Sequence, residues 1–280
     1  MKLSNLPLGV TLYSDKAVYD SIPIEWTLIQ HNFSATKTFE ANTSVLLSKF
    51  ILTFKAFDAV ETATRSNYMS ALTFGSNDYV LSNIREWLNG KSVLDWGIAE
   101  GRTSPIKEGV CYNPYAEELG FMSRFEPEFV DIMSPMHLNC NMQSGFVNTV
   151  DDLVGLPSLN ELGFHSNLME GETLDYFNKR FHKAKRRQAT PIDKALERAS
   201  ADFLADFPNC NPYKHWGYLL RSIDEDASMG YCRVSAVTEA GKLGSIFAFN
   251  GSLGIRPMIT IEDCSLSYQE NLDAYKIILK

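Results

Sequence analysis

Residues 79–90 read YVLSNIREWLNG, and this stretch guides the interpretation of the whole chain. Its apolar side chains recur at helical spacing, at Val80, Leu81, Ile84, Trp87 and Leu88. The Asn-Gly pair that closes it is a typical helix stop. We therefore predict a short amphipathic helix and, because both ends of the chain have the pattern of strands, an α+β fold.

Strand signals lie on both sides of this helix. Residues 22–29 alternate between apolar and polar side chains, and residues 45–54 are rich in Leu, Ile and Phe, with a turn signal just before them. Near the carboxyl end, turn-rich segments separate further predicted strands, at 216–221, 232–237, 244–249 and 254–261. Their spacing is typical of an antiparallel β-meander. The final apolar run, 274–279, predicts an edge strand that returns near the first one.

The region between the strands contains most of the helical signal. Pro127 stands in the first turn of a short predicted helix, residues 158–161 (SLNE) fit a capping box, and residues 191–207 have the pattern of a longer helix. Long polar connections separate these helices. We predict one domain over 1–280, made of N-terminal strands (1–61), a helix and loop region (62–208) and a C-terminal β-meander (209–280).

The composition is that of an acidic globular protein. Apolar residues make up 45% of the chain, charged residues 21%, and the formal net charge is −8. The negative charge argues against a nucleic-acid partner or an anionic membrane. No segment approaches the roughly 20 apolar residues that cross a bilayer, and the amino terminus lacks the apolar region of a secretion signal. We therefore expect synthesis in the cytoplasm and no membrane insertion.

The cysteines and histidines give no sign of a metal or catalytic centre. The cysteines lie 22 or more residues apart, which predicts buried thiols rather than disulfides or a zinc site. They are Cys111, Cys140, Cys210, Cys232 and Cys264. The histidines show no metal-ligand spacing, and nucleophile-elbow, P-loop and dinucleotide motifs are absent. We expect no cofactor, no metal and no catalytic residue.

Five segments, in order along the chain, resemble the motifs of an uncharacterised domain family found in phages and Gram-positive bacteria. They are NDYVLSNIREWLN (77–89), GFMSRFEPEF (120–129), DLVGLPSLNELG (152–163), WGYLLRS (216–222) and GIRPMI (254–259). Two shorter N-terminal matches, LPLG and IEW, also fit. The chain departs from the family pattern at 217–218, where Gly-Tyr and an extra Leu occur, and at 223–226, where IDED replaces a Pro-Gly turn. These departures affect the expected loop shape there.

The closing pattern of this family resembles that of C-type-lectin-like and sulfatase-modifying-factor folds. The resemblance implies a C-type-lectin-like mixed fold with an antiparallel β-meander, short helices and long loops. Its signature residues in this chain are Arg85, Trp87, Trp216, Arg221 and Arg256. We expect them to be architectural, with tryptophans anchoring the core and arginines binding buried carboxylates or carbonyls; the alternative is direct ligand contact.

In lectin-like folds the loops around the last strands often hold the ligand. The corresponding residues of this chain are Tyr213, Asp224, Glu225, Asp226, Tyr231 and Asn250. The acidic run 224–226 could offer oxygen ligands to calcium, although its spacing matches no calcium loop, and a solvated hairpin tip is the alternative. The basic run 182–187 (HKAKRR) is interpreted as a solvated helix end, with a phosphate or partner contact as the alternative.

The resemblance and the absence of catalytic motifs favour a non-catalytic structural or binding protein. We expect a component of a phage virion or phage-tail-like particle, in a decoration, baseplate or receptor-binding role, with a lectin-like loop face. Its partners would be other virion or tail proteins or a bacterial surface ligand, and a homo-oligomer is compatible with this. One alternative is a bacterial surface adhesin that binds carbohydrate or protein. A remote one is an oxidase like the sulfatase-modifying factors, whose reactive thiols would have to be Cys232 and Cys264.

Overall fold

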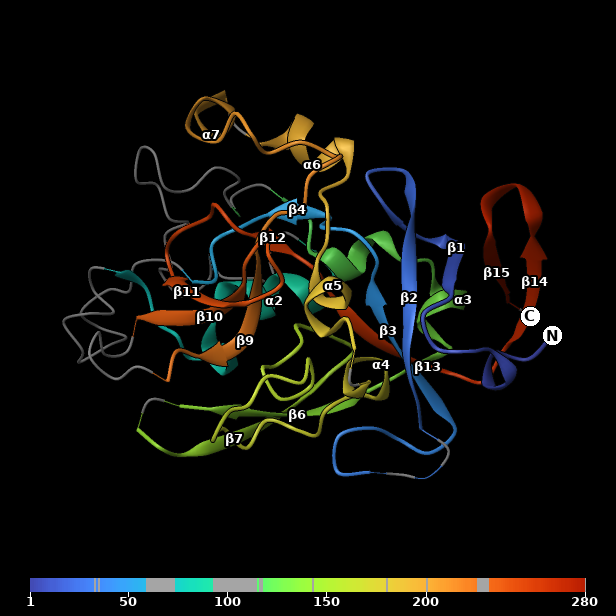
Figure 1. The fold of residues 1–280 in the computed structure, drawn as a ribbon. Coiled ribbons are helices and arrows are strands. Elements are labelled where there is room, and N and C mark those ends of the chain that lie inside the picture. Colours follow the sequence, from blue (N-terminus) through green and yellow to red (C-terminus); the bar gives the residue numbers. More distant parts are fainter. Residues whose placement is uncertain are drawn as a thin grey trace.

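The computed structural model describes residues 1–32, 34, 36–58, 74–92, 115, 118–142, 144–179, 181–199, 201–225 and 232–279. These residues form strands and short helices joined by long connections, so the fold is α+β as predicted (Figure 1). Within the described residues the strands form a large sheet, a smaller sheet and a two-stranded ribbon.

The large sheet joins both ends of the chain. Its strands are β1 (Thr11–Tyr19), β2 (Ile22–Asn32), β3 (Thr43–Ser48), β5 (Met133–Ser134), β8 (Val154–Gly155), β13 (Met258–Glu262), β14 (Ser265–Gln269) and β15 (Ala274–Ile278). The described strands pair in the order β14-β15-β1-β2-β3-β13-β5, and β8 pairs with β13 beside this path. Asp20 and Ser21 join β1 to β2 with φ of 53° and 64°, the positive values that a tight hairpin turn requires.

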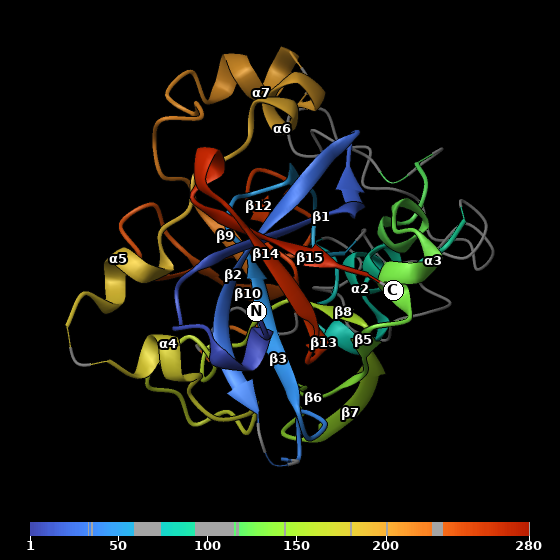
Figure 2. The same cartoon turned by 90° about the vertical axis from the view of Figure 1, so that its right-hand side faces the viewer.

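The carboxyl-terminal strands lie beside the amino-terminal one, as predicted. β15 runs parallel to β1, with Leu12 opposite Tyr275, and Lys2 pairs with Ser265. Figure 2 shows the molecule from this side, with β14 and β15 in front. The prediction that 274–279 is an edge strand is wrong, because β14 pairs with the outer side of β15.

The smaller sheet contains part of the predicted meander. Its strands are β4 (Thr53–Phe54), β9 (Tyr218–Ile223), β10 (Arg233–Val237), β11 (Leu243–Phe247) and β12 (Gly254–Ile255), in the order β11-β10-β9-β12-β4. β9, β10 and β11 are successive antiparallel neighbours, which confirms the meander for these three. β12 instead returns to pair in parallel with β9, so the meander ends there.

Two predicted strands each divide between the two sheets. The run 45–54 becomes β3 and β4, and the run 254–261 becomes β12 and β13. The two crossings lie together, because the Leu52 N–H donates to the Ile255 carbonyl over 3.0 Å. A Cβ at Gly254 would lie 2.3 Å from Cγ2 of Ile51, so only glycine fits this close approach. The chain therefore passes between the two sheets twice, and both passages lie side by side.

The helices are short, and two differ from prediction. They are η1 (Leu3–Asn5), η2 (Tyr79–Leu81), α2 (Asn83–Asn89), η3 (Phe121–Arg124), α3 (Pro127–Val130), α4 (Asp175–Asn178), α5 (Lys183–Arg187), α6 (Asp193–Arg198), α7 (Ala201–Asp206) and η5 (Glu270–Leu272). Pro127 occupies the first turn of α3 as predicted. The helix predicted over 79–90 begins only at Asn83, because Ser82 is extended and its hydroxyl caps α2. Leu81 is therefore 51% exposed, not on the core face.

The helix predicted over 191–207 is also divided. Ala199 is extended, with ψ of 140°, and ends α6. Beyond it, the Phe203 ring of α7 packs on Phe54 of β4, with 4.5 Å between ring centroids. The turn at Ala199 lets both helices pack near β4, at the top of Figure 1.

The ribbon consists of β6 (Met136–Asn141) and β7 (Val147–Asp152). It lies at the bottom of Figure 1, beneath β9, and β6 contacts both β8 and β9. One continuous cluster of buried apolar side chains includes residues of α2, of the ribbon and of both sheets.

Candidate functional site

Arg221 is the centre of a buried ionic cluster. It lies in β9, and its Nη1 and Nη2 donate to the two carboxylate oxygens of Glu161 over 2.6 and 2.7 Å. The two side chains are 0% and 1% exposed. Burial disfavours the guanidinium charge, but the adjacent Glu161 carboxylate outweighs this and raises the pKa of Arg221. A two-pronged pair fixes orientation as well as charge.

Arg221 also binds the backbone of three neighbouring segments. Nη1 donates to the Leu156 carbonyl over 2.7 Å, and Nη2 donates to the Glu170 carbonyl over 3.0 Å. Nε donates to the carbonyl of Asn139 in β6 over 3.4 Å. One side chain thus joins β9 to the ribbon and to two connections, which is the contact pattern expected of an architectural arginine.

The predicted capping box forms beside this cluster. The Ser158 N–H donates to Oε2 of Glu161 over 2.9 Å, and the Glu161 N–H donates to the Ser158 hydroxyl over 3.2 Å. No α-helix follows these two residues, because Gly163 takes a φ of 69° and ends the turn. The capping carboxylate is the same one that Arg221 binds.

Glu170 is a second buried carboxylate of the cluster. It accepts hydrogen bonds from the Ser222 hydroxyl and from the Asn141 N–H, the latter over 3.1 Å. Burial is the main cause that raises the pKa of Glu170. The next residue, Gly171, has a φ of 100°, and a Cβ there would lie 3.2 Å from Oε1 of Glu161. The 170–171 segment is therefore fitted closely against the cluster.

The motif of α2 supplies a second ion pair. Nε and Nη2 of Arg85 donate to the Asp152 carboxylate, each at 2.8 Å, and Nη1 donates to the Val80 carbonyl over 2.8 Å. Asp152 ends β7, so this pair ties α2 to the ribbon. Trp87 is fully buried and packs edge-on against Tyr19 of β1.

The other two signature residues connect distant parts of the chain. Trp216 is half-buried, its indole N–H donates to the Ser252 carbonyl over 3.0 Å, and its ring packs edge-on against Phe207. Arg256 is 4% exposed. Its Nε donates to the Ser48 carbonyl over 2.6 Å, at the point where the two sheets join. Through these bonds both side chains hold together segments that lie far apart in the sequence.

The structure does not bring the predicted ligand loops into one place. Tyr213 is 92% exposed and precedes β9, whereas Asp224 and Glu225 follow the far end of β9. Asp224 lies 3.2 Å from Nε of Arg233, and Glu225 accepts from the Asn167 N–H over 3.0 Å. Asp226 and Tyr231 lie outside the described residues.

Asn250, the remaining predicted ligand residue, shapes its own loop. Its side-chain oxygen accepts from the Ser252 N–H over 2.9 Å. Residue 252 in turn supplies the carbonyl that Trp216 binds.

The basic run 182–187 differs from its interpretation as a solvated helix end. Arg187 is 7% exposed and donates to the carbonyls of Leu162 and Gly163 over 2.8 and 2.7 Å. Its guanidinium lies 3.7 Å from the centre of the Phe164 ring. The run therefore ends in a buried arginine that holds the turn after the capping box, and only its earlier residues reach the surface.

The described cysteines are buried free thiols, as predicted for this set, and Cys111 lies outside the described residues. Burial raises the pKa of Cys140 and Cys210 to about 12 and that of Cys264 to about 11. It also raises the pKa of Cys232. These shifts make the thiolate form scarce at neutral pH.

Two surface cavities lie beside the connection from β2 to β3, which we call the β2–β3 loop (residues 33–42). Sequence reasoning did not identify either. The first, the polar cavity, has a volume of about 650 Å³. It is lined by Gln30, Asn32, Thr36, Lys37, Thr38, Phe39, Asn139, Gly171, Glu172, Thr173, Leu174 and Asp175. Amides and hydroxyls dominate this lining.

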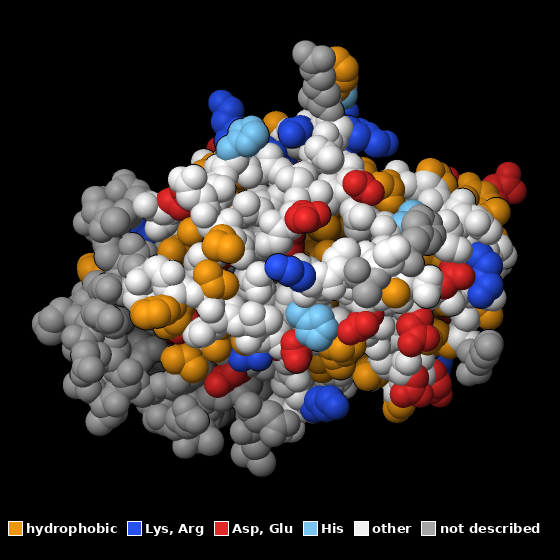
Figure 3. Space-filling view, turned by 90° about the horizontal axis from the view of Figure 1, so that it is seen from below, with side chains coloured by type: hydrophobic (Ala, Val, Ile, Leu, Met, Phe, Trp, Pro, Cys, Tyr) orange, Lys and Arg blue, Asp and Glu red, His pale blue; other side chains and the backbone are white. Residues whose placement is uncertain are grey.

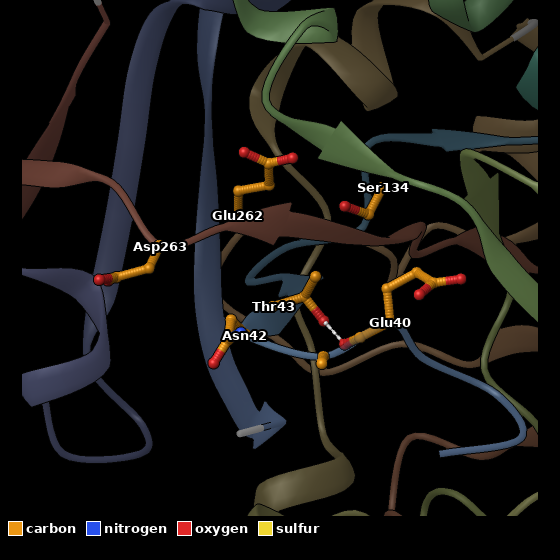
Figure 4. A pocket seen from close by; sticks show the side chains of 7 residues that line it. Glu40, Asn42, Thr43, Ser134, Glu262 and Asp263 are labelled. Carbon is orange, nitrogen blue, oxygen red and sulfur yellow. Dashed lines mark hydrogen bonds between the residues drawn. The ribbon is translucent and has the colours of Figure 1, made fainter. Parts of the chain in front are cut away.

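The second, the acidic cavity, has a volume of about 500 Å³ and is lined by Glu40, Ala41, Asn42, Thr43, Ser134, Glu262 and Asp263 (Figure 4). Figure 3 shows the lower face of the molecule, where acidic side chains gather on the side of β2, β3 and β13. Among the described residues, no three His, Cys, Asp or Glu side chains are placed to hold a metal ion.

His137 fixes the loop between the two cavities. Its Nδ1 lies 2.6 Å from an Asp151 carboxylate oxygen, and its Nε2 lies 3.2 Å from one of Glu40. Its backbone N–H donates to the Thr38 carbonyl over 2.9 Å. Hydrogen bonds to these two carboxylates raise the pKa of His137. The β2–β3 loop is therefore attached to the ribbon.

Comparison with known proteins places the chain in one family. Residues 41–263 match the family described as a domain of unknown function, DUF6273. No curated protein and no solved structure matches the chain. No helix in the described part of the chain has both the length and the apolar character needed to cross a membrane.

Proposed function

This chain belongs to the DUF6273 family, and from that premise we propose that it is a non-catalytic binding module whose polar cavity takes a carbohydrate. We further propose a C-type-lectin-like fold and a place in a phage virion or phage-tail-like particle, in a decoration, baseplate or receptor-binding role.

The observation that carries the proposal is the link between Arg221 and the polar cavity. Arg221 binds the carbonyl of Asn139 and the carbonyl of Glu170. Asn139 lines the cavity, and so does Gly171, which follows Glu170. Arg221, one of the signature residues, thus holds two walls of a surface cavity in place from within the core. A ligand that binds between such fixed walls loses little free energy to the ordering of protein side chains and loops.

The chemistry of the lining favours a carbohydrate. Thr38 and Thr173 offer hydroxyls that no described residue binds, and the Asn139 amide keeps its N–H donors while its oxygen accepts from Thr149. The amides of Gln30 and Asn32 also line the cavity, but they are hydrogen-bonded to the surrounding backbone. Hydroxyls and amides both donate and accept hydrogen bonds, as the hydroxyls of a sugar require. Lys37 adds a positive charge, and Glu172 and Asp175 add negative ones. The volume lies within the range of small-molecule sites, roughly 300–1,000 Å³.

Two further points support the finer parts of the proposal. The two ends of the chain meet in one sheet, with a smaller sheet and long connections inserted between them, which suits a lectin-like scaffold. The resemblance of the five motif segments to a family of phages and Gram-positive bacteria supports the particle setting. A surface adhesin is the other setting in which the same cavity would serve.

Cosedimentation with purified bacterial cell walls tests the binding role. We expect the protein to sediment with walls, and soluble wall polysaccharide to compete. Thr173→Trp fills the cavity from a lining position and should abolish sedimentation. Asn209→Trp, at an exposed position near α7, is the matched control and should sediment normally.

Equal sedimentation of the two variants, or none by the unmodified chain, would remove the carbohydrate proposal. The particle setting is tested separately, by searching purified particles from the source locus for this chain. Its absence from them would leave the adhesin setting.

A further inference from the structure

The acidic cavity is lined by charge of one sign. Three acidic residues line it, and among the described residues no Lys, Arg or His does. In Figure 4 the Asp263 carboxylate is directed away from Glu262 and Ser134. The charge is only partly compensated: Glu40 contacts His137, and Asp263 accepts from the Ser4 N–H and lies 3.6 Å from Lys2. Within the described part of the chain, the Glu262 carboxylate has no hydrogen bond or ion pair.

Ser134 gives this cavity a polar group that has no partner among the described residues. Ser134 is 7% exposed, and its carbonyl accepts from the Thr260 hydroxyl over 2.7 Å. Its own hydroxyl has no hydrogen bond to any described residue, and Figure 4 shows it directed into the cavity, toward the side of Glu262. The hydroxyl oxygen is not one of the fully buried side-chain atoms that lack a partner, so it can be reached from the cavity and can accept an N–H of a ligand.

The arrangement suits an organic cation better than a metal ion. A metal needs its ligands within about 2.5 Å of one point, and no three acidic, histidine or cysteine side chains of the described residues are placed for that. A guanidinium carries five N–H donors spread over a planar fork. It can reach carboxylates and a hydroxyl that stand several ångströms apart.

We propose that the acidic cavity binds a guanidinium group, presented by an arginine side chain of a partner protein. Glu262 and Glu40 supply the negative charge at the opening, and the Ser134 hydroxyl accepts an N–H at the base. The long apolar stem of arginine allows its head to enter while the partner backbone remains outside. This site is distinct from the polar cavity and does not depend on carbohydrate binding.

The test is a titration of the ¹⁵N-labelled full chain with the peptide acetyl-Gly-Arg-Gly-amide, followed by NMR. We expect saturable shifts at the amides of Ser134, Thr43 and Glu262. The same peptide with citrulline, which has nearly the same shape without the charge, should cause none. Shifts of equal size with citrulline, or saturable shifts only elsewhere in the molecule, would overturn the proposal.

Variants separate charge from folding. Glu262→Gln should weaken peptide binding about fivefold, the upper range for a solvent-accessible ion pair. Ser134→Ala should weaken it by about threefold to fivefold without lowering stability, because the hydroxyl makes no bond within the described chain. Glu239→Gln makes the same charge change at an exposed turn of the smaller sheet and should have no effect.

Unchanged affinity in Glu262→Gln would refute the site. Equal affinity for a lysine peptide would refute the guanidinium assignment. Thr173→Trp should bind the arginine peptide normally, so loss of carbohydrate binding and loss of arginine binding can be told apart.

Discussion

Replacing Arg221 by methionine removes the charge at the centre of the buried cluster but keeps an unbranched side chain. Glu161, whose side chain is 1% exposed, is then left without its counter-charge. Breaking a buried pair from one side costs about 3–5 kcal/mol. The carbonyls of Leu156 and Glu170 also lose a donor, at about 1 kcal/mol or more each. The total, about 5–7 kcal/mol, is comparable to the whole stability of many domains, roughly 5–15 kcal/mol.

We therefore expect Arg221→Met to be largely unfolded or to aggregate, as measured by urea unfolding followed with far-UV circular dichroism. The second variant makes the test specific. Adding Glu161→Gln removes the stranded carboxylate, so the double variant should regain about 2–3 kcal/mol relative to Arg221→Met alone. Arg221→Lys, which keeps the charge but not the two-pronged geometry, should fall between the single variant and the unmodified protein.

Two results would refute this reasoning. One is an Arg221→Met protein whose unfolding midpoint equals that of the unmodified chain. The other is a double variant less stable than Arg221→Met, because that would mean the Glu161 carboxylate is satisfied without the arginine.

Two further predictions concern the loop and the half-buried tryptophan. The pKa of His137 is raised in the folded protein, so the stability it adds is complete below its unfolded pKa of about 6.5 and is lost as pH rises through the folded pKa. His137→Asn should therefore lower the free energy of unfolding by at most about 1 kcal/mol at pH 5.5, since the site is partly exposed. The loss should become progressively smaller at higher pH, and a loss that does not change with pH would contradict this. Trp216→Ala should lower the free energy of unfolding by about 3 kcal/mol, and with it the midpoint of urea unfolding, because contacts with Phe207 and Ser252 are lost. An unchanged midpoint would show that the ring is not part of the core.

Local chemistry accounts for what the sequence predicted well. Pro127 begins α3, and Ser158 and Glu161 form their capping bonds, because each depends on residues within one turn. Predictions that needed longer apolar runs were less accurate. The sequence of 45–54 does not show that this segment crosses from one sheet to the other. The crossing depends on contacts with Gly254 and Ile255, some 200 residues away in the chain.

The cavities could not be predicted because their walls come from distant segments. The polar cavity is formed by β2, the β2–β3 loop, β6 and residues 171–175. One available signal was the polar segment 32–44, NFSATKTFEANTS, which is long for a hairpin connection between two apolar strands. Arg221 was identified from its motif, but its partner Glu161 was noted only as a capping residue, since pairing across 60 residues leaves no local pattern.

The buried ionic cluster around Arg221 both stabilises the fold and shapes the polar cavity. Substitutions in the cluster therefore cannot separate an effect on ligand contacts from an effect on folding. Any substitution of Arg221 or Glu161 would alter the positions of Asn139 and Glu170 and lower stability at once. Loss of binding in such a variant would therefore not identify a ligand contact. Thr173 lines the cavity without belonging to the cluster. The ligand preference of this chain is consequently expected to depend on such lining residues, and relatives that share the motif arginines can bind different ligands.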